Sequence, residues 1–274
     1  MKKILVLSSQ SQEAEQERLE QLSARLSGCE FVIFAPKVFR GLFKEFRFNR
    51  ALKKAAQQAD LILVCPAAHT ERLLYLGKPV HPLLDGVDFE AFNAAKERSL
   101  PFPDNLFNVK NPIIGYLGTI DDNVNLQTLE LAAEAYPEWS FVLVGPVRTD
   151  VDFLGKFPNI HILGEKPRLH LPAYLSRFDV CVNLAKNNGA SAENLYQYLS
   201  AGKPIVSAPH PAVALDYTEA IYLAGTPEEF IALCKKAIVE RDAWKVRRRV
   251  EYGRAAGWDA RAAELERIIK ELYT

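Results

Sequence analysis

An amphipathic helix that leads into an apolar strand is predicted by the stretch Asn194-Leu195-Tyr196-Gln197-Tyr198-Leu199-Ser200-Ala201-Gly202-Lys203-Pro204-Ile205-Val206. Its apolar residues recur three and four positions apart, which is the spacing of one helix face. Gly202 is typical of the position just beyond a helix C-terminus, and Pro204 prevents the helix from continuing. A short apolar run after a helix predicts a buried parallel strand, so this stretch indicates an α/β sheet protein.

The same alternation runs along the rest of the chain. Strands are predicted at residues 4–7, 30–34, 61–65, 113–117, 140–144, 160–163, 180–184, 204–207 and 220–224. Helices are predicted at residues 13–26, 49–58, 126–136, 171–176 and 228–239. This order predicts right-handed βαβ units in parallel sheets that carry helices on both faces. A polar, proline-bearing stretch between Phe92 and Pro112 is the best candidate for an interdomain linker.

Composition excludes several classes of partner. Lys+Arg and Asp+Glu both total 34, so no net charge would attract nucleic acid. No apolar stretch approaches the roughly 20 residues of a membrane span, and four scattered cysteines fit a reducing cytoplasm. Cys181 is expected to be a buried free thiol. The basic run 245–249 is interpreted as the solvated face of a late helix, with a membrane- or partner-binding patch as the alternative.

Glycines follow three of the predicted strands, at Gly118, Gly145 and Gly164. Glycine lets the backbone come close to a phosphate, and the carboxyl ends of parallel strands are where such sheets bind ligands. An ordinary tight turn explains the Gly118 motif equally well. The dinucleotide fingerprint Gly-x-Gly-x-x-Gly is missing, so an NAD-dependent oxidoreductase is only a distant alternative.

The order of the motifs resembles a known family. Gly115-Tyr116-Leu117-Gly118 is followed by segments 137–146, 158–164, 171–175 and 178–181, and then by the opening stretch. Together they resemble the donor-binding domain of group 1 bacterial glycosyltransferases of the GT-B fold, in the branch that makes polysaccharide and teichuronic acid. The resemblance implies two Rossmann-like domains, a shortened acceptor-side domain at 1–95 with the last helix 259–274 packing back, and a nucleotide-sugar-binding domain at 108–256.

The resemblance also implies where the donor binds. The nucleotide base would lie near Gly145 and the 164–166 loop, and the diphosphate by Gly118, Thr119 and the helix that begins at Asn194, with no metal ion. The implied donor-binding residues are Gly118, Thr119, Gly145, Gly164, Lys166, Lys186, Asn194, Leu195 and Gln197.

Two departures from the family pattern bear on catalysis. Asn194 stands where the family has a lysine that neutralises the leaving diphosphate, and Gln197 stands where it has a ribose-binding glutamate. Lys186 either compensates or is a solvated loop lysine. The candidate catalytic residues are Asn194, Gln197 and His69. His69 follows a strand and is the only histidine that merits a catalytic test.

We expect a glycosyltransferase that moves a sugar from a nucleotide donor to a saccharide or lipid-linked acceptor. The alternative is a degenerate relative, which would be either a non-catalytic nucleotide-sugar-binding protein or an accessory subunit that needs a protein partner. The aromatic and arginine run 38–50 is interpreted as a core helix, with docking of a lipid-linked acceptor, membrane surface or nucleic acid as alternatives. Asp150 and Asp152 form the Asp-x-Asp of metal-dependent transferases of another fold and are interpreted as an incidental surface pair.

Overall fold

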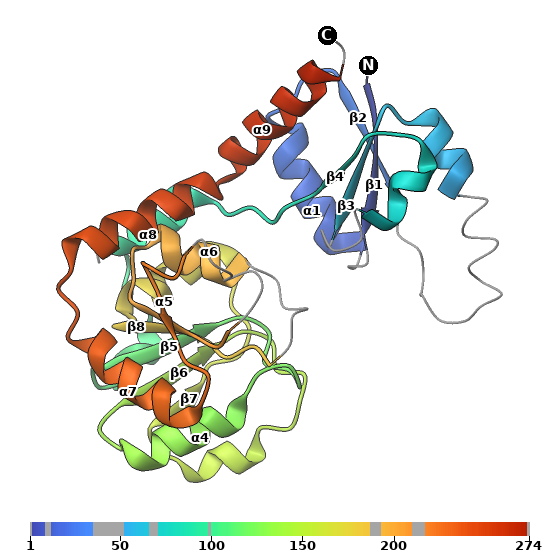
Figure 1. The fold of residues 1–274 in the computed structure, drawn as a ribbon. Coiled ribbons are helices and arrows are strands. Elements are labelled where there is room, and N and C mark those ends of the chain that lie inside the picture. Colours follow the sequence, from blue (N-terminus) through green and yellow to red (C-terminus); the bar gives the residue numbers. More distant parts are fainter. Residues whose placement is uncertain are drawn as a thin grey trace. The chain divides into compact units, whose positions relative to one another are not determined.

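Two compact units make up the protein. The computed structural model describes residues 2–8, 12–34, 52–65, 71–97, 100–186, 193–209 and 217–272 (Figure 1). Contacts divide the chain into a first unit, residues 1–86 with 258–274, and a second unit, residues 87–257. The α/β class with parallel sheets and flanking helices is therefore confirmed.

The first unit is built on a four-stranded parallel sheet in the order β2-β1-β3-β4. Its elements are β1 (Lys2–Ser8), α1 (Gln12–Ser23), β2 (Cys29–Phe34), β3 (Leu61–Cys65), the 3₁₀ helix η2 (Glu71–Leu76), β4 (Val80–Pro82), α9 (Trp258–Glu271) and a helix at 52–58. Alternate residues of β1 pack into different layers, because side chains of a strand point to opposite faces. Ile4 and Val6 pack with α1 and α9, whereas Leu5 and Leu7 pack with helix 52–58.

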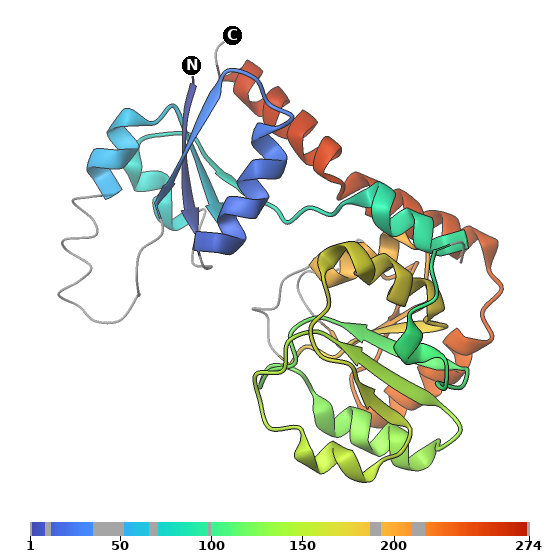
Figure 2. The same cartoon turned by 180° about the vertical axis from the view of Figure 1, so that it is seen from behind.

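The second unit has a six-stranded parallel sheet in the order β10-β9-β8-β5-β6-β7, seen from two sides in Figures 1 and 2. The strands are β5 (Ile113–Leu117), β6 (Ser140–Val144), β7 (Ile160–Ile162), β8 (Val180–Asn183), β9 (Ile205–Ser207) and β10 (Tyr222–Leu223). The α-helices are α3 (Phe89–Asn93), α4 (Leu126–Ala135), α5 (Leu171–Arg177), α6 (Glu193–Ser200), α7 (Pro227–Ile238) and α8 (Ala243–Ala255). The 3₁₀ helices are η3 (Ala94–Glu97), η4 (Asp104–Leu106), η5 (Asp152–Lys156) and η6 (Arg168–His170).

Helices cover both faces of this sheet. Leu117 and Cys181 face a cluster that includes α3, α5 and α6, whereas Tyr116 and Val180 face a cluster that includes α4 and α7. Gly115 lets the Phe178 ring lie directly on β5, because a Cβ atom there would be 2.1 Å from the ring. Every residue of β5 and β6 is buried, as expected of the central strands of a parallel sheet.

The order in which the strands are added to the sheet reverses beside β5, although all the strands run parallel. From β5 the chain adds β6 and β7 on one side, and then returns to add β8, β9 and β10 on the other. The loops after β5 and β8 therefore leave in opposite directions and open a crevice at the carboxyl ends of these strands, which is where such sheets bind ligands.

Local signals in the sequence set several helix starts. Asp88, Asn125, Thr226 and Asp242 precede α3, α4, α7 and α8, and each accepts a hydrogen bond from a backbone N–H of the first turn. This capping supplies partners for N–H groups that have none within the helix.

Two sequence interpretations need correction, and one strand was not predicted. The stretch between Phe92 and Pro112 is not a free linker in its described residues, because Ala95 and Leu106 belong to the core of the second unit, which begins at Val87. The short edge strand β4 was missed, since three residues that include a proline give no strand signal. Within the basic run 245–249, Arg249 is fully buried and forms an ion pair with Glu240 at 2.5 Å, so the run is not simply a solvated face.

Cys181 is buried and carries a free thiol, as predicted. Burial raises the pKa of this thiol to about 12, so Cys181 is not a reactive nucleophile at neutral pH. Across the described ranges, no helix is both long and apolar enough to span a bilayer. The 38–50 run and His69 lie outside the described residues.

Candidate functional site

A pocket of about 450 Å³ lies at the carboxyl ends of the strands in the second unit. It is at the crevice beside β5, and it takes residues from the loops after β5, β6, β7 and β8 and from the start of α6. Its lining residues are Tyr116, Leu117, Gly118, Thr119, Asp121, Asn123, Val124, Val144, Gly145, Pro146, Glu165, Lys166, Arg168, Leu171, Asn183, Ala185, Glu193, Asn194 and Gln197. The volume is within the usual range for small-molecule sites.

The floor of the pocket depends on two glycines. Gly118 and Gly145 have φ angles of 146° and 151°, which disfavour residues with a side chain. A Cβ atom at Gly145 would lie only 1.9 Å from the carbonyl oxygen of Gly118. Backbone hydrogen bonds from Gly118 N–H to Val144 O (2.9 Å) and from Gly145 N–H to Gly164 O (3.0 Å) join the three strand ends. The glycines therefore make a flat backbone surface that a ligand can approach closely.

Helix α6 is fixed against β5 by Tyr198. The backbone N–H of Leu117 donates to the Tyr198 hydroxyl at 2.7 Å, and this side chain is fully buried. On its other side, α6 packs on α8 so closely that a Cβ atom at Gly253 would be 2.5 Å from the backbone nitrogen of Ser200. These contacts position the first turn of α6 at the pocket.

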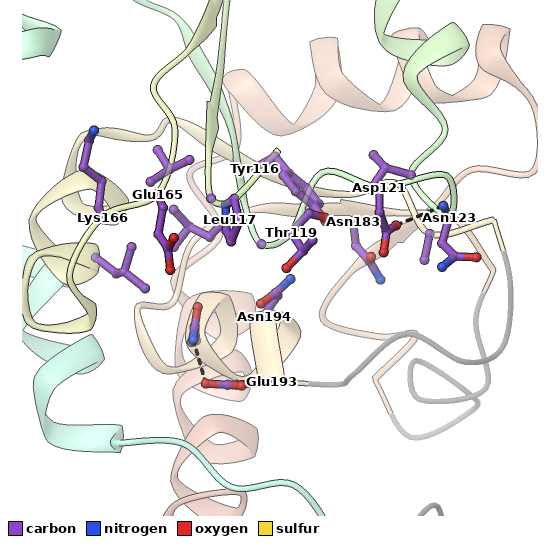
Figure 3. Close-up of a pocket in the computed structure, with 18 of the residues that line it drawn as sticks. Tyr116, Leu117, Thr119, Asp121, Asn123, Glu165, Lys166, Asn183, Glu193 and Asn194 are labelled. Atoms are coloured by element: carbon purple, nitrogen blue, oxygen red, sulfur yellow. Dashed lines mark hydrogen bonds between the residues drawn. The ribbon is translucent and has the colours of Figure 1, made fainter. Parts of the chain in front are cut away.

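Asn194 extends from that first turn toward Thr119, as Figure 3 shows. A Cβ atom at Gly118 would be 2.3 Å from Asn194 Nδ2, so the amide lies against the glycine turn. The Tyr116 hydroxyl donates to the Thr119 carbonyl at 3.0 Å. Burial, and then the charge of Asp121, raise the pKa of Tyr116 well above its ordinary value, so this hydroxyl stays protonated and holds the turn.

Gln197 lies one turn further along α6. Its side chain is almost fully buried, and its Nε2 donates to Glu193 Oε1 at 3.3 Å, the contact drawn as a dashed line in Figure 3. Its Oε1 is buried and has no hydrogen-bond partner in the described part of the chain. A buried carbonyl oxygen without a donor is costly, so this atom is suited to accept a hydrogen bond from a ligand hydroxyl.

Charged side chains line the pocket on two sides. Arg168 of η6 forms an ion pair with Glu193 of α6. Lys166 donates to the Leu163 carbonyl at 2.5 Å, and in Figure 3 its ammonium group points away from Thr119 and Asn194. On the opposite side, the side chains of Asp121, Asn123 and Asn183 complete the lining.

The structure brings together most of the residues that the sequence singled out. Gly118, Thr119, Gly145, Lys166, Asn194 and Gln197 all line the pocket. Leu195 does not line it, because this residue is 2% exposed and packs in the core under α6. Gly164 contributes only its carbonyl to the Gly145 N–H.

Lys186 is exposed, donates to the Asp122 carbonyl at 3.2 Å and is outside the lining set. His69 lies outside the described residues.

Glu193 lines the pocket, as its place next to Asn194 in the sequence suggests, whereas sequence reasoning missed Arg168, Asn123 and Asn183 as site residues. A signal existed for Asn183, which ends an apolar strand, and for Asn123, which follows the glycine turn of β5. No signal in the sequence connected Arg168 with Glu193, because this pair depends on how η6 and α6 pack.

Among the residues described, no group of three or more His, Cys, Asp or Glu side chains could hold a metal ion. Asp150 Oδ1 accepts the Asp152 N–H at 2.9 Å, and both residues are exposed outside the pocket.

Comparison with known proteins gives a relative by sequence and several by fold. No family model matches the sequence. The chain is 29% identical over 217 residues to a candidate teichuronic acid biosynthesis glycosyltransferase, TuaH, of Bacillus subtilis (strain 168). The match covers 72% of this chain and 54% of TuaH, so this chain spans about half of that relative's length.

Solved structures show the same fold. HepE of Anabaena in complex with UDP and glucose matches with a TM-score of 0.66 at 12% identity, over 98% of this chain and 100% of HepE. A candidate UDP-N-acetylglucosamine 2-epimerase from Listeria monocytogenes matches with a TM-score of 0.59 at 12% identity, over 100% of this chain and 97% of that structure. At this identity the likeness establishes the fold alone, which is that of the GT-B glycosyltransferases and is shared with this candidate epimerase.

Proposed function

We propose that this protein is a glycosyltransferase that takes a sugar from a UDP-sugar and passes it to a saccharide or lipid-linked acceptor in cell-surface polysaccharide synthesis. The observation that carries the proposal is the pocket at the switch point of the sheet, where two obligatory glycines expose backbone beside Asn194 and Gln197. The second unit would bind the donor and the first unit the acceptor. The complexes of HepE with UDP and glucose, and the similarity to TuaH, support this choice of donor and pathway.

The donor would lie along the pocket in a defined direction. Its base would lie near Gly145 and the 164–166 loop, and its ribose hydroxyls would donate to the unpaired Oε1 of Gln197. The diphosphate would lie against Gly118, Thr119 and Asn194, where a helix N-terminus and backbone N–H groups stabilise negative charge. Such a site needs no metal ion.

In the reaction, the bond between the anomeric carbon and the diphosphate oxygen breaks while an acceptor hydroxyl adds to that carbon and gives up its proton. Negative charge develops on the leaving diphosphate, so hydrogen-bond donors fixed around it lower the barrier. Asn194 contributes an amide donor at this place but no charge. The protein therefore has to stabilise the leaving group mainly with dipoles and with the charges at the pocket wall.

A second candidate is a nucleotide-sugar-binding protein without transferase activity. It is favoured by one observation: Lys166 is bonded to the Leu163 carbonyl and Arg168 is paired with Glu193, so both cations of the described lining are engaged within the protein. Binding of the donor is common to both candidates, whereas release of UDP in the presence of an acceptor belongs to the transferase alone.

Thermal unfolding with UDP, GDP, ADP and CMP tests the site. Ligand at about one hundred times its Kd stabilises the folded state by roughly 2.7 kcal/mol, which is easily measured. UDP is expected to give the largest increase in Tm. If none of the four nucleotides raises Tm, both candidates fail. A UDP-release assay with UDP-glucose and polysaccharide-derived acceptors then separates the transferase from the binding protein.

A further inference from the structure

Arg168 and Glu193 meet across the wall of the pocket although they belong to different elements. Arg168 begins η6 and Glu193 begins α6, and Arg168 Nη2 is in direct contact with Glu193 Oε1. The two side chains are 57% and 33% exposed, so the ion pair is partly hydrated. Ion pairs of this kind contribute little to stability, and the guanidinium can therefore exchange its partner for a stronger anion at small cost.

Glu193 also affects Gln197. The Gln197 amide donates its Nε2 to the same Glu193 oxygen, which leaves Gln197 Oε1 buried without a hydrogen-bond partner among the described residues. The Glu193 carboxylate thus contacts both Arg168 and Gln197, and the Oε1 atom of Gln197 remains available as an acceptor. A ligand that brings an anion for Arg168 and a hydroxyl for Gln197 would satisfy both groups at once.

The charges around the pocket leave Arg168 as the best cation for such an anion. The described lining holds three carboxylates, on Asp121, Glu165 and Glu193, and two cations, on Lys166 and Arg168. The Lys166 ammonium is bonded to a backbone carbonyl and points away from Thr119 and Asn194 (Figure 3). Arg168, in contrast, already contacts a carboxylate, and its planar fork of donors matches phosphate as well.

We propose that Arg168 binds the phosphates of the donor and that Glu193 competes with them for its guanidinium group. This inference rests on the proposed function, since it concerns the diphosphate of the same nucleotide. Arg168 then supplies, from η6, the positive charge that Asn194 lacks. Glu193 sets the affinity, because the diphosphate has to displace its carboxylate before the guanidinium can bind it.

Calorimetric titration with UDP and with uridine, at one fixed salt concentration, tests this assignment. Uridine has the base and ribose but no phosphate, so it reports on the rest of the site. Arg168→Gln should weaken UDP binding about tenfold or more, whereas Glu193→Gln should strengthen it by about three- to tenfold. Both variants should change uridine affinity less than about twofold, because uridine has no phosphate charge for Arg168 to attract or for Glu193 to repel. In the double variant, the gain from Glu193→Gln should disappear.

Control variants are available in the same unit. Lys156 and Glu130 form an exposed ion pair at 2.8 Å outside the pocket, so Lys156→Gln and Glu130→Gln should leave UDP affinity unchanged. Arg168→Lys keeps the charge without the planar fork, and UDP affinity should fall between the wild-type value and that of Arg168→Gln. The Tm of each variant without nucleotide shows that it is folded.

Three results would overturn the inference. UDP affinity could be the same in Arg168→Gln as in the wild type, or uridine binding could weaken as much as UDP binding, which would place Arg168 at the nucleoside. Weaker UDP binding by Glu193→Gln would contradict the proposal that Glu193 competes with the diphosphate for Arg168. In these cases the wild type still binds UDP, so the proposed function stands. If the wild type binds neither ligand, the proposed function itself fails together with this inference.

Discussion

The backbone N–H of Leu117 donates to the buried hydroxyl of Tyr198 across 2.7 Å, which bonds the last residue of β5 to the helix that faces the pocket. Tyr198→Phe would leave this buried N–H without its partner. We expect the free energy of unfolding to fall by about 1–3 kcal/mol. Urea denaturation measures the change.

Tyr136→Phe is the matched control for this substitution. The Tyr136 ring is half-buried and stacks on Trp139, with ring centroids 4.2 Å apart. Loss of its hydroxyl should change stability by no more than about 0.5 kcal/mol. If both variants were equally stable, the Leu117–Tyr198 bond would not be what fixes α6.

The two glycines of the pocket floor should not tolerate a methyl group. Gly145→Ala places a Cβ atom 1.9 Å from the Gly118 carbonyl oxygen at a φ of 151°. We expect a loss of about 1–3 kcal/mol in stability, from the clash, and a loss of the Tm increase caused by UDP. Gly155→Ala in η5 is the control, because its Cβ would meet nothing within 4 Å, and it should behave as the wild type. An unchanged UDP response in Gly145→Ala would exclude the floor as the nucleotide surface.

Asn194→Lys places a positive charge beside the glycine turn. Since the Asn194 amide lies against Gly118, a lysine there would place its ammonium group near the proposed diphosphate. UDP affinity should rise about tenfold, and kcat should rise with it if the leaving group is stabilised. Asn194→Met has similar length without charge and should bring no gain. Equal effects of lysine and methionine would contradict the charge argument.

Arg249 and Glu240 form a buried ion pair in the second unit. Arg249 donates to Glu240 Oε1 at 2.5 Å and to Oε2 at 2.8 Å, and the two side chains are 0% and 4% exposed. Arg249→Met should lower the free energy of unfolding by about 3–5 kcal/mol, because it leaves a buried carboxylate without its partner. Chemical denaturation of this variant and of Arg247→Met, an exchange in the same helix, provides the comparison.

The same pair predicts a pH dependence. Burial alone would raise the pKa of Glu240, but hydrogen bonds from Arg249 and Tyr222 and the charges of Arg249 and Lys245 outweigh it and hold this pKa below its ordinary value. A depressed carboxyl pKa stabilises the fold above the unfolded-state value of about 4.3, and this stability is lost as the pH falls below it. The wild type should therefore lose more stability than Glu240→Gln between about pH 5 and pH 3. If the free energies of unfolding of the two proteins fell equally over this pH range, Glu240 would not contribute to the pH dependence.

The central strands were predictable from sequence for a simple physical reason. In β5 and β6 every residue is buried, so each strand is mostly apolar, and a glycine follows each of them. The edge strand β4 has only three residues, one of which is a proline. Its place depends on pairing with β3 rather than on its own sequence. The segment after Phe92 reads as a linker, yet Leu106 is buried there by contacts that sequence periodicity does not encode.

The site was predictable in its backbone and less so in its charges. Gly118 and Gly145 follow apolar strands, and parallel strands bring their carboxyl ends to one edge, so their meeting follows from the topology. Leu195 was expected at the ligand but faces the core, because the direction of a helical side chain depends on which face packs. Arg168 and Glu193 are 25 residues apart, and only the packed structure shows that they form an ion pair.

Helix α9 completes the core of the first unit with the last part of the chain. Trp258, Ala262 and Leu265 pack in one cluster with Ile4 and Val6 of β1. During synthesis on the ribosome, β1 emerges before the whole second unit, and its partners in α9 emerge only after that unit. The second unit is continuous in sequence and can fold as soon as it has left the exit tunnel, whereas the first unit waits with an exposed apolar face. Chaperone binding to nascent chains should therefore concentrate on the N-terminal segment and end only when α9 is released.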